Sequence, residues 1–236
     1  AIKFAADSAG VDDTFVVANG DIVTALPIAD LVRFHHALGR EATIHLTPVD
    51  DPSSFGVVEL SNDRLVRQFV EKPAQGETSS NLVNAGTYVV EPSVLDRIPA
   101  DVPVSVERET FPQLVAEGEL AGFSTEDAWI DTGRPEFYLK ANLAYADSAG
   151  AVVRSQVSTS ASLSGVVADG ATIEDGAIVR NSVILPGAVI EADARVDRSL
   201  VWGRVSSEAS VTDAVVGQDG VVPAGEYRGA RFPEPT

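Results

Sequence analysis

The sequence predicts an α/β domain followed by a parallel β-helix, and three observations support this division. Short apolar segments alternate with helical patterns over the first part of the chain, which is typical of a sheet covered by helices. Aliphatic residues then recur every six positions in the last part of the chain. A small-residue stretch at 146–150 separates the two patterns, so we expect one domain over residues 1–147 and another over 148–236.

The elements of the first domain follow from apolar spacing and from the residues that end each segment. Gly39 and Gly118 follow two helical patterns as C-terminal caps, and Ser105 precedes the second of these as an N-cap. The segment 13–18 is expected to be a buried parallel strand that delivers a carboxylate at its end. Strands are predicted over residues 13–18, 42–48, 55–60, 65–70, 82–90 and 128–131, and helices over 29–38, 92–98, 105–117 and 134–145.

Composition excludes several classes of protein. The 236 residues contain 17 Lys and Arg against 35 Asp and Glu, a net charge of −18, and we find no basic stripe that would bind nucleic acid. The absence of Cys excludes disulfides, thiolate metal sites and cysteine nucleophiles. No apolar stretch approaches the roughly 20 residues that span a bilayer, so we expect a cytoplasmic protein with no membrane partner. The chain contains no Met and begins at Ala1, which indicates a fragment or a processed chain.

The repeat in the second domain pairs aliphatic with small residues. A repeat of six residues suits coils of three short strands, with the aliphatic side chains stacked inside and the small residues at the bends. The alternative is a β-sandwich with glycine turns, but the period persists over several coils. The predicted inward residues are Val167, Ile173, Val179, Ile190, Val196 and Trp202, preceded by Ala171, Ala177, Ala188 and Ala194.

Six segments in order carry a family resemblance over nearly the whole chain. They are Phe15-Val-Val-Ala-Asn-Gly-Asp21, Phe55-Gly-Val-Val58, Phe69-Val-Glu-Lys-Pro73, Asn84-Ala-Gly-Thr-Tyr88, Ser105-Val-Glu-Arg-Glu-Thr-Phe-Pro112 and Trp129-Ile-Asp-Thr-Gly133. Together with the hexapeptides, they resemble the sugar-phosphate nucleotidyltransferases, most closely the mannose-1-phosphate guanylyltransferase group. The resemblance implies a partial Rossmann-like nucleotidyltransferase sheet followed by a left-handed β-helix.

The resemblance also implies a reaction and a metal. In this family a sugar-1-phosphate attacks the α-phosphorus of a nucleoside triphosphate (NTP), and pyrophosphate leaves. Mg²⁺ would neutralise the charge that builds between the two anions. Asp21 and Asp131 match the family carboxylates that hold this metal, so both are also candidate catalytic residues. The alternative for each aspartate is a turn-capping role.

Five further residues match family positions that contact the sugar phosphate. By resemblance, Glu71 accepts hydrogen bonds from sugar hydroxyls, and Lys72 neutralises the phosphate as a third candidate catalytic residue. Gly56, Asn84 and Gly86 match positions where the backbone or an amide approaches the sugar. The alternatives are an exposed Glu-Lys pair of little energetic value and glycines that only permit a bulge.

Two features depart from what a complete active site would show. The family opens with a Gly-Gly-x-Gly-Thr-Arg-Leu loop and a downstream Pro-Lys-Pro that hold the NTP, and neither occurs here. We therefore expect the chain alone to be inactive.

The pair His35-His36 suggests a metal, but the sequence offers no third ligand at the usual spacing, so both are expected to be surface or packing residues.

Three functions remain open from the sequence. The first is a nucleotidyltransferase fragment acting on mannose-1-phosphate and GTP, with glucose-1-phosphate thymidylyl-, uridylyl- or adenylyltransferase as the near alternative. The second is a non-catalytic regulatory or assembly paralogue. The third, a hexapeptide acyltransferase, is disfavoured because no His follows His45 to serve as a base. The β-helix is expected to form a homo-oligomer through its flat faces.

Overall fold

The computed structural model describes residues 1–233, apart from 75, 101, 150–155 and 159. The chain divides into a first unit, Ala1–Ile130, and a second unit, Asp131–Thr236. Part of the stretch at 146–150 that suggested a domain boundary lies outside the described residues. Within the described part, no helix combines the length and apolar character that a membrane span requires.

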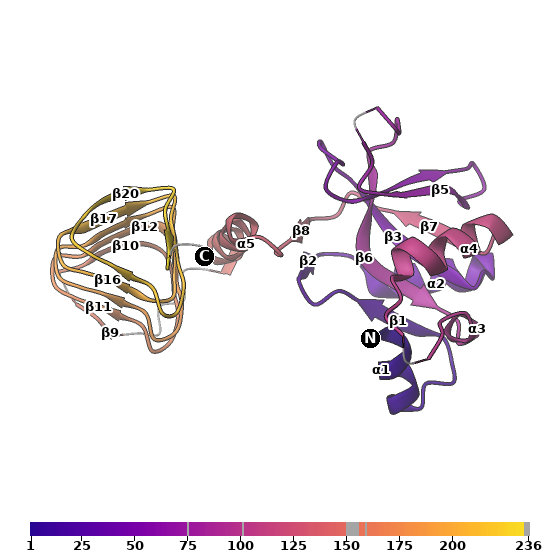
Figure 1. Cartoon of the computed structure of the whole chain (residues 1–236), viewed down its shortest axis with the longest axis horizontal. Helices are drawn as coiled ribbons and strands as arrows, with labels where there is room; N and C mark the ends of the chain where they lie inside the picture. Colours follow the sequence, from indigo (N-terminus) through magenta and orange to yellow (C-terminus); the bar gives the residue numbers. More distant parts are fainter. Residues whose placement is uncertain (75, 101, 150–155, 159, 234–236) are drawn as a thin grey trace. The chain divides into compact units, whose positions relative to one another are not determined.

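A mixed sheet forms the centre of the first unit (Figure 1). Its strands lie in the order β5 (Val66–Glu71), β4 (Gly56–Leu60), β6 (Leu82–Val90), β3 (Ala42–Pro48) and β7 (Leu120–Ser124). β3 and β7 run parallel, whereas β6 is antiparallel to both β3 and β4. The predicted α/β class is therefore confirmed for this unit.

The expectation of a buried parallel strand at 13–18 is wrong. β1 (Phe15–Ala18) pairs antiparallel with β6, with Phe15 opposite Val90. Its residues alternate between partly buried and exposed, because successive side chains of a strand point to opposite faces and one face of β1 stays open to solvent. An apolar run of this length does not by itself distinguish the two strand types.

Helices cover both faces of the sheet, and the alternation of β3 defines the two faces. Ile44 and Leu46 belong to the apolar core that contains Phe111 and Leu114 of α4 (Phe111–Glu117). Thr43, on the opposite face, contacts His35 of α2 (Ile28–Leu38). Two other helices of this unit are α1 (Ile2–Ala9) and α3 (Ser93–Asp96).

The helix expected over 105–117 forms in two parts. Ser105 caps it, with Oγ accepting from the Arg108 backbone N–H at 3.3 Å. Residues Val106–Thr110 are π-helical (η1), and the Phe111 N–H donates to the Val106 carbonyl. Pro112 lacks the N–H that an α-helix would direct to the carbonyl four residues earlier, which accounts for the wider turn before α4.

The second unit is a parallel β-helix preceded by α5 (Pro135–Ala149), which contacts β10 and β12. Strands stack in register from coil to coil, as the nested β10, β12, β17 and β20 show (Figure 1). The strands are β9 (Gln156–Val157), β10 (Ser162–Val167), β11 (Thr172–Ile173), β12 (Ile178–Ile184), β13 (Val189–Ile190), β14 (Arg195–Asp197), β15 (Leu200–Val201), β16 (Arg204–Val205), β17 (Ala209–Thr212), β18 (Val215–Val216), β19 (Val221–Val222), β20 (Gly225–Arg228) and β21 (Arg231–Phe232).

The inward positions follow the predicted repeat with one exception. Val167, Ile173, Val179, Ile190 and Val196 are all buried, as are the four predicted alanines. Trp202 is 44% exposed, and Val201 occupies the core instead, so the prediction for Trp202 is wrong. The step from Val196 to Val201 is five residues, because the corner at Arg198, in the left-handed region with φ 43°, takes one residue fewer.

Candidate functional site

A bulge in β6 brings the first of the predicted site residues against the turn that follows β1. The Asn19 N–H donates to the Gly86 carbonyl at 2.8 Å. Gly86 has φ 75°, and a Cβ built on it would lie 2.9 Å from Asn19 Nδ2. This position therefore requires glycine, because both the backbone conformation and the neighbouring side chain exclude a larger residue.

Asn84 holds the bulge through both ends of its amide. Its Nδ2 donates to the Tyr88 hydroxyl at 3.0 Å, and its Oδ1 accepts from the Gly86 N–H at 3.0 Å. Burial raises the pKa of Tyr88 well above its ordinary value, and the charges of Glu107 and Glu71 raise this pKa further. The phenol thus stays protonated, and Asn84 positions the bulge through internal contacts.

Gly56 and Glu71 face each other across the β4–β5 pair. A Cβ on Gly56 would lie 2.7 Å from Phe69 Cζ and 2.9 Å from Glu71 Oε2, so a side chain here would displace the carboxylate. Lys72 follows with φ 52°, an uncommon conformation for a residue other than glycine, and its N–H donates to the Phe55 carbonyl at 2.9 Å. The exposed lysine therefore has a defined backbone position beside Glu71.

Trp129 links the β6 bulge to the start of β4. Its Nε1 donates to the Ala85 carbonyl at 3.0 Å, and its ring lies edge-on to Phe55 with centroids 5.6 Å apart. Gly56, Glu71, Lys72, Asn84 and Gly86 are thereby connected to the Asn19 turn through direct contacts. Asn19, Phe55 and Trp129 were not proposed as site residues, although all three lie in the segments that carry the family resemblance.

The two predicted metal ligands lie next to a short pair of strands. Exposed Asp21 directly precedes β2 (Ile22–Thr24), and Asp131 ends β8 (Trp129–Asp131), which pairs with β2. Asp131 Oδ1 accepts from the Gly133 N–H at 2.8 Å, the turn-capping contact that was its alternative role. Carboxylate oxygens suit Mg²⁺, so the donor chemistry of the pair fits that ion.

A different set of residues has metal-binding geometry. Among the described residues, His35, His36 and Glu91 are the one group of three or more potential ligands whose donor atoms all lie within 4.8 Å of one another. His36 is exposed and His35 is buried, in line with the expected surface and packing roles, but the fold also brings to them Glu91, which directly follows β6 and lies far away in the sequence. The His35 hydrogen bond also holds the pKa of the Glu91 carboxyl below its usual range.

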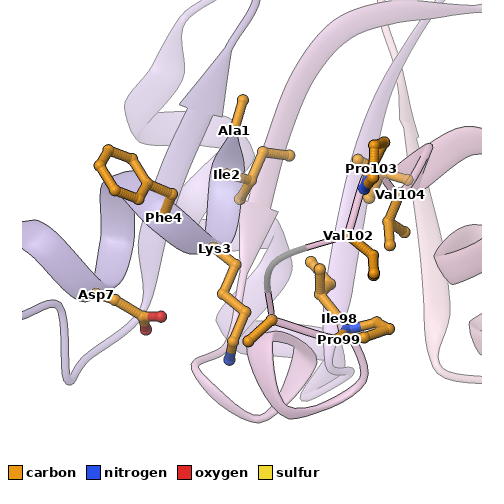
Figure 2. Close-up of a pocket in the computed structure, with 12 residues that line it drawn as sticks. Ala1, Ile2, Lys3, Phe4, Asp7, Ile98, Pro99, Val102, Pro103 and Val104 are labelled. Atoms are coloured by element: carbon orange, nitrogen blue, oxygen red, sulfur yellow. The ribbon is translucent and has the colours of Figure 1, made fainter.

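Two cavities of the first unit differ in their relation to these residues. One of about 440 Å³ is lined by residues of 51–53 and by Pro73, Ala74, Gly76 and Thr78, directly after Lys72. Another of about 440 Å³ lies between α1 and residues 98–100, 102–104 and 106, with Ile2, Phe4, Ile98 and Val102 around it (Figure 2). None of the predicted site residues lines this second cavity.

Both parts of the chain match the sequences of known proteins. The protein-family model described as nucleotidyl transferase matches residues 1–148, and the family model described as GlmU-like, C-terminal hexapeptide matches residues 147–231. A probable mannose-1-phosphate guanylyltransferase 1 of Oryza sativa is 36% identical over 214 residues, 88% of this chain and 58% of the relative. A mannose-1-phosphate guanyltransferase of Schizosaccharomyces pombe is 43% identical over 136 residues, 57% of this chain and 37% of the relative.

A solved structure supports the same assignment. A putative glucose-1-phosphate thymidylyltransferase from Bacillus anthracis aligns with a TM-score of 0.54 and 25% identity, over 62% of this chain and 59% of that one. The chain spans 58% of the length of the rice relative. The matched family covers the whole first unit, and the hexapeptide match covers most of the β-helix. The chain belongs to the nucleotidyl transferase family and carries a C-terminal hexapeptide β-helix.

Proposed function

We propose that this chain provides the sugar-phosphate side of a mannose-1-phosphate guanylyltransferase. The reaction joins mannose-1-phosphate and GTP into GDP-mannose and releases pyrophosphate. The contacts that connect Gly56, Glu71, Lys72 and the β6 bulge carry this proposal, and the names of the rice and fission yeast relatives support the choice of sugar and nucleotide.

Each residue has a role that follows from its chemistry. Glu71 is an acceptor for sugar hydroxyls, and Lys72 supplies a positive charge for the phosphate. Gly56 leaves room for the Glu71 carboxylate and Gly86 for the Asn19 side chain, so both glycines keep these groups in place, and Asn84 positions the bulge. Asp21 and Asp131 would hold Mg²⁺, which would neutralise charge on the phosphates when bound.

The 236 residues contain no Gly-rich loop that would hold the triphosphate. We therefore propose that this chain by itself binds the sugar phosphate without forming a nucleotide sugar. A cytoplasmic location and assembly through the β-helix also stay predictions, and light scattering tests the second.

Two other functions have specific support. The Bacillus anthracis neighbour favours glucose-1-phosphate as an alternative substrate, with thymidylyl transfer as the reaction. A regulatory paralogue is the other alternative, but such a protein would not need Lys72 in its unusual backbone conformation beside Glu71.

Isothermal titration of mannose-1-phosphate and glucose-1-phosphate into the chain, with and without Mg²⁺, tests the proposal. We expect tighter binding of mannose-1-phosphate, a loss of at least about tenfold in Lys72→Ala, and no change in the exposed control Lys140→Ala. Equal effects of both lysine variants would contradict the assigned role. Formation of GDP-mannose by the chain alone would disprove its proposed inactivity.

A further inference from the structure

We propose that His35, His36 and Glu91 bind a first-row divalent transition metal of the zinc type at the C-terminal end of α2. Their donor atoms lie within 4.8 Å of one another, and His35 Nε2 is only 2.9 Å from Glu91 Oε1. Two imidazoles and one carboxylate are typical ligands of Zn²⁺ and its neighbours, whereas Mg²⁺ prefers oxygen. The site lies within the first unit and includes none of the residues assigned to the sugar phosphate.

The surroundings of His35 orient it as a ligand. The side chain is 1% exposed, and its Nδ1 lies 2.9 Å from Thr43 Oγ1. When Nδ1 carries the proton and donates it to Thr43, the Nε2 lone pair faces the Glu91 carboxylate. Metal-bound histidines commonly donate their second ring N–H to such a partner. A cation between Nε2 and Oε1 would then occupy the place of a hydrogen-bonding proton.

The other two ligands have complementary properties. Glu91 is held in place by Thr14, whose hydroxyl donates to Oε1 at 2.8 Å. His36 is exposed, so its side chain has room to change rotamer. Tetrahedral Zn²⁺ with bonds of about 2.0–2.1 Å separates its ligand atoms by roughly 3.3 Å, which His36 could reach by a small rotation.

The C-terminal end of α2 also favours a bound cation electrostatically. Both histidines lie in the last turn of α2, which ends at Gly39 in the left-handed conformation. The carbonyl groups of a helix C-terminus carry partial negative charge and favour cations nearby. Three ligands also leave a fourth position for water, as in other sites with two histidines and one glutamate.

Titration of Zn²⁺ into the chelator-stripped chain tests this site by calorimetry, with Co²⁺ absorption as a report of tetrahedral geometry. We expect one saturable site, weakened at least about tenfold in His36→Gln and in Glu91→Gln. Asp96→Asn is the matched control, because it removes one exposed carboxylate of the same unit outside the cluster and should leave binding unchanged.

His36→Gln keeps the test independent of folding. Its side chain is exposed, so the metal-free melting temperature should equal that of the wild type, whereas His35→Gln alters a buried contact. Absence of saturable binding up to about 1 mM Zn²⁺ would overturn the proposal. Equal affinity in His36→Gln, Glu91→Gln and Asp96→Asn would also overturn it and would assign the metal to other surface carboxylates. Neither result bears on binding of the sugar phosphate.

Discussion

Gly86 determines how the β6 bulge meets the turn after β1, so we expect Gly86→Ala to be costly. The added Cβ would meet Asn19 Nδ2 at 2.9 Å in a backbone conformation with φ 75°. We expect a loss of about 2–4 kcal/mol in the free energy of unfolding, measured with urea. Gly39→Ala is the control, since Gly39 has φ 59° but nothing within 4 Å, and it should lose only about 1 kcal/mol. Equal losses would show that crowding at Asn19 has no effect.

His45 should make the protein sensitive to mild acid. Burial in β3 lowers its pKa from 6.5 to about 4, and its Nδ1 has no hydrogen-bond partner among the described residues. At a pH between these two pKa values, the unfolded chain binds more protons than the folded chain, so the free energy of unfolding falls as the pH falls. The free energy of unfolding should lose about 2 kcal/mol from this group between pH 7.5 and pH 5.

His45→Gln removes this titration and can still bond to Thr125, the partner of His45 Nε2 at 2.9 Å. Its free energy of unfolding should therefore change about 2 kcal/mol less than that of the wild type over the same pH range. Urea unfolding at the two pH values measures the difference. Parallel pH profiles of wild type and His45→Gln would contradict the lowered pKa.

At the scale of the elements, a ladder of buried serines holds one corner of the β-helix. Ser182 Oγ accepts from the Ser199 N–H at 3.0 Å, and Ser199 Oγ accepts from the Ala214 N–H at 3.0 Å. Ser199→Ala leaves the Ala214 N–H without this partner, so we expect a loss of about 1–3 kcal/mol in the free energy of unfolding. Ser207→Ala, at an exposed position, should lose less than about 0.5 kcal/mol in the same urea experiment. Similar values for both would contradict the role of the ladder.

Elements with a strong pattern could be predicted from the sequence, and elements defined by tertiary contacts could not. The predicted bounds of the strands at 42–48 and 82–90 are those of β3 and β6. β7 was missed because Gly122 interrupts its short apolar run; a Cβ on Gly122 would lie 2.4 Å from Leu60 Cδ2. The misplacement of Trp202 has a similar cause, since a five-residue corner shifts the phase of the repeat.

The candidate sites show the same limit. The motifs indicated Gly56, Glu71 and Gly86, but the contacts that connect them through Trp129 depend on the fold. Glu91 lies 55 positions or more from both histidines in the sequence, so no local spacing could indicate that it joins them. Ligand spacing identifies a metal site only when the ligands share an element or a loop.

At the scale of the whole molecule, the two units have separate apolar cores. One core gathers residues such as Ile44, Leu46 and Phe111, and the core of the β-helix contains Ile190 and Val196, with no residue in common. A substitution that creates a cavity in one core should therefore leave the packing of the other core unchanged. Because no residue belongs to both cores, we expect two unfolding transitions rather than one.

Calorimetry of two matched core variants tests this independence. Ile190→Ala should destabilise the β-helix by about 2–5 kcal/mol and lower one melting temperature only. Leu46→Ala should lower the other by a similar free energy, because both side chains are fully buried. The assignment of each transition then follows from which variant shifts it. A single transition that both variants shift together would show that the two units unfold as one, and the separate cores would then not define separate folding units.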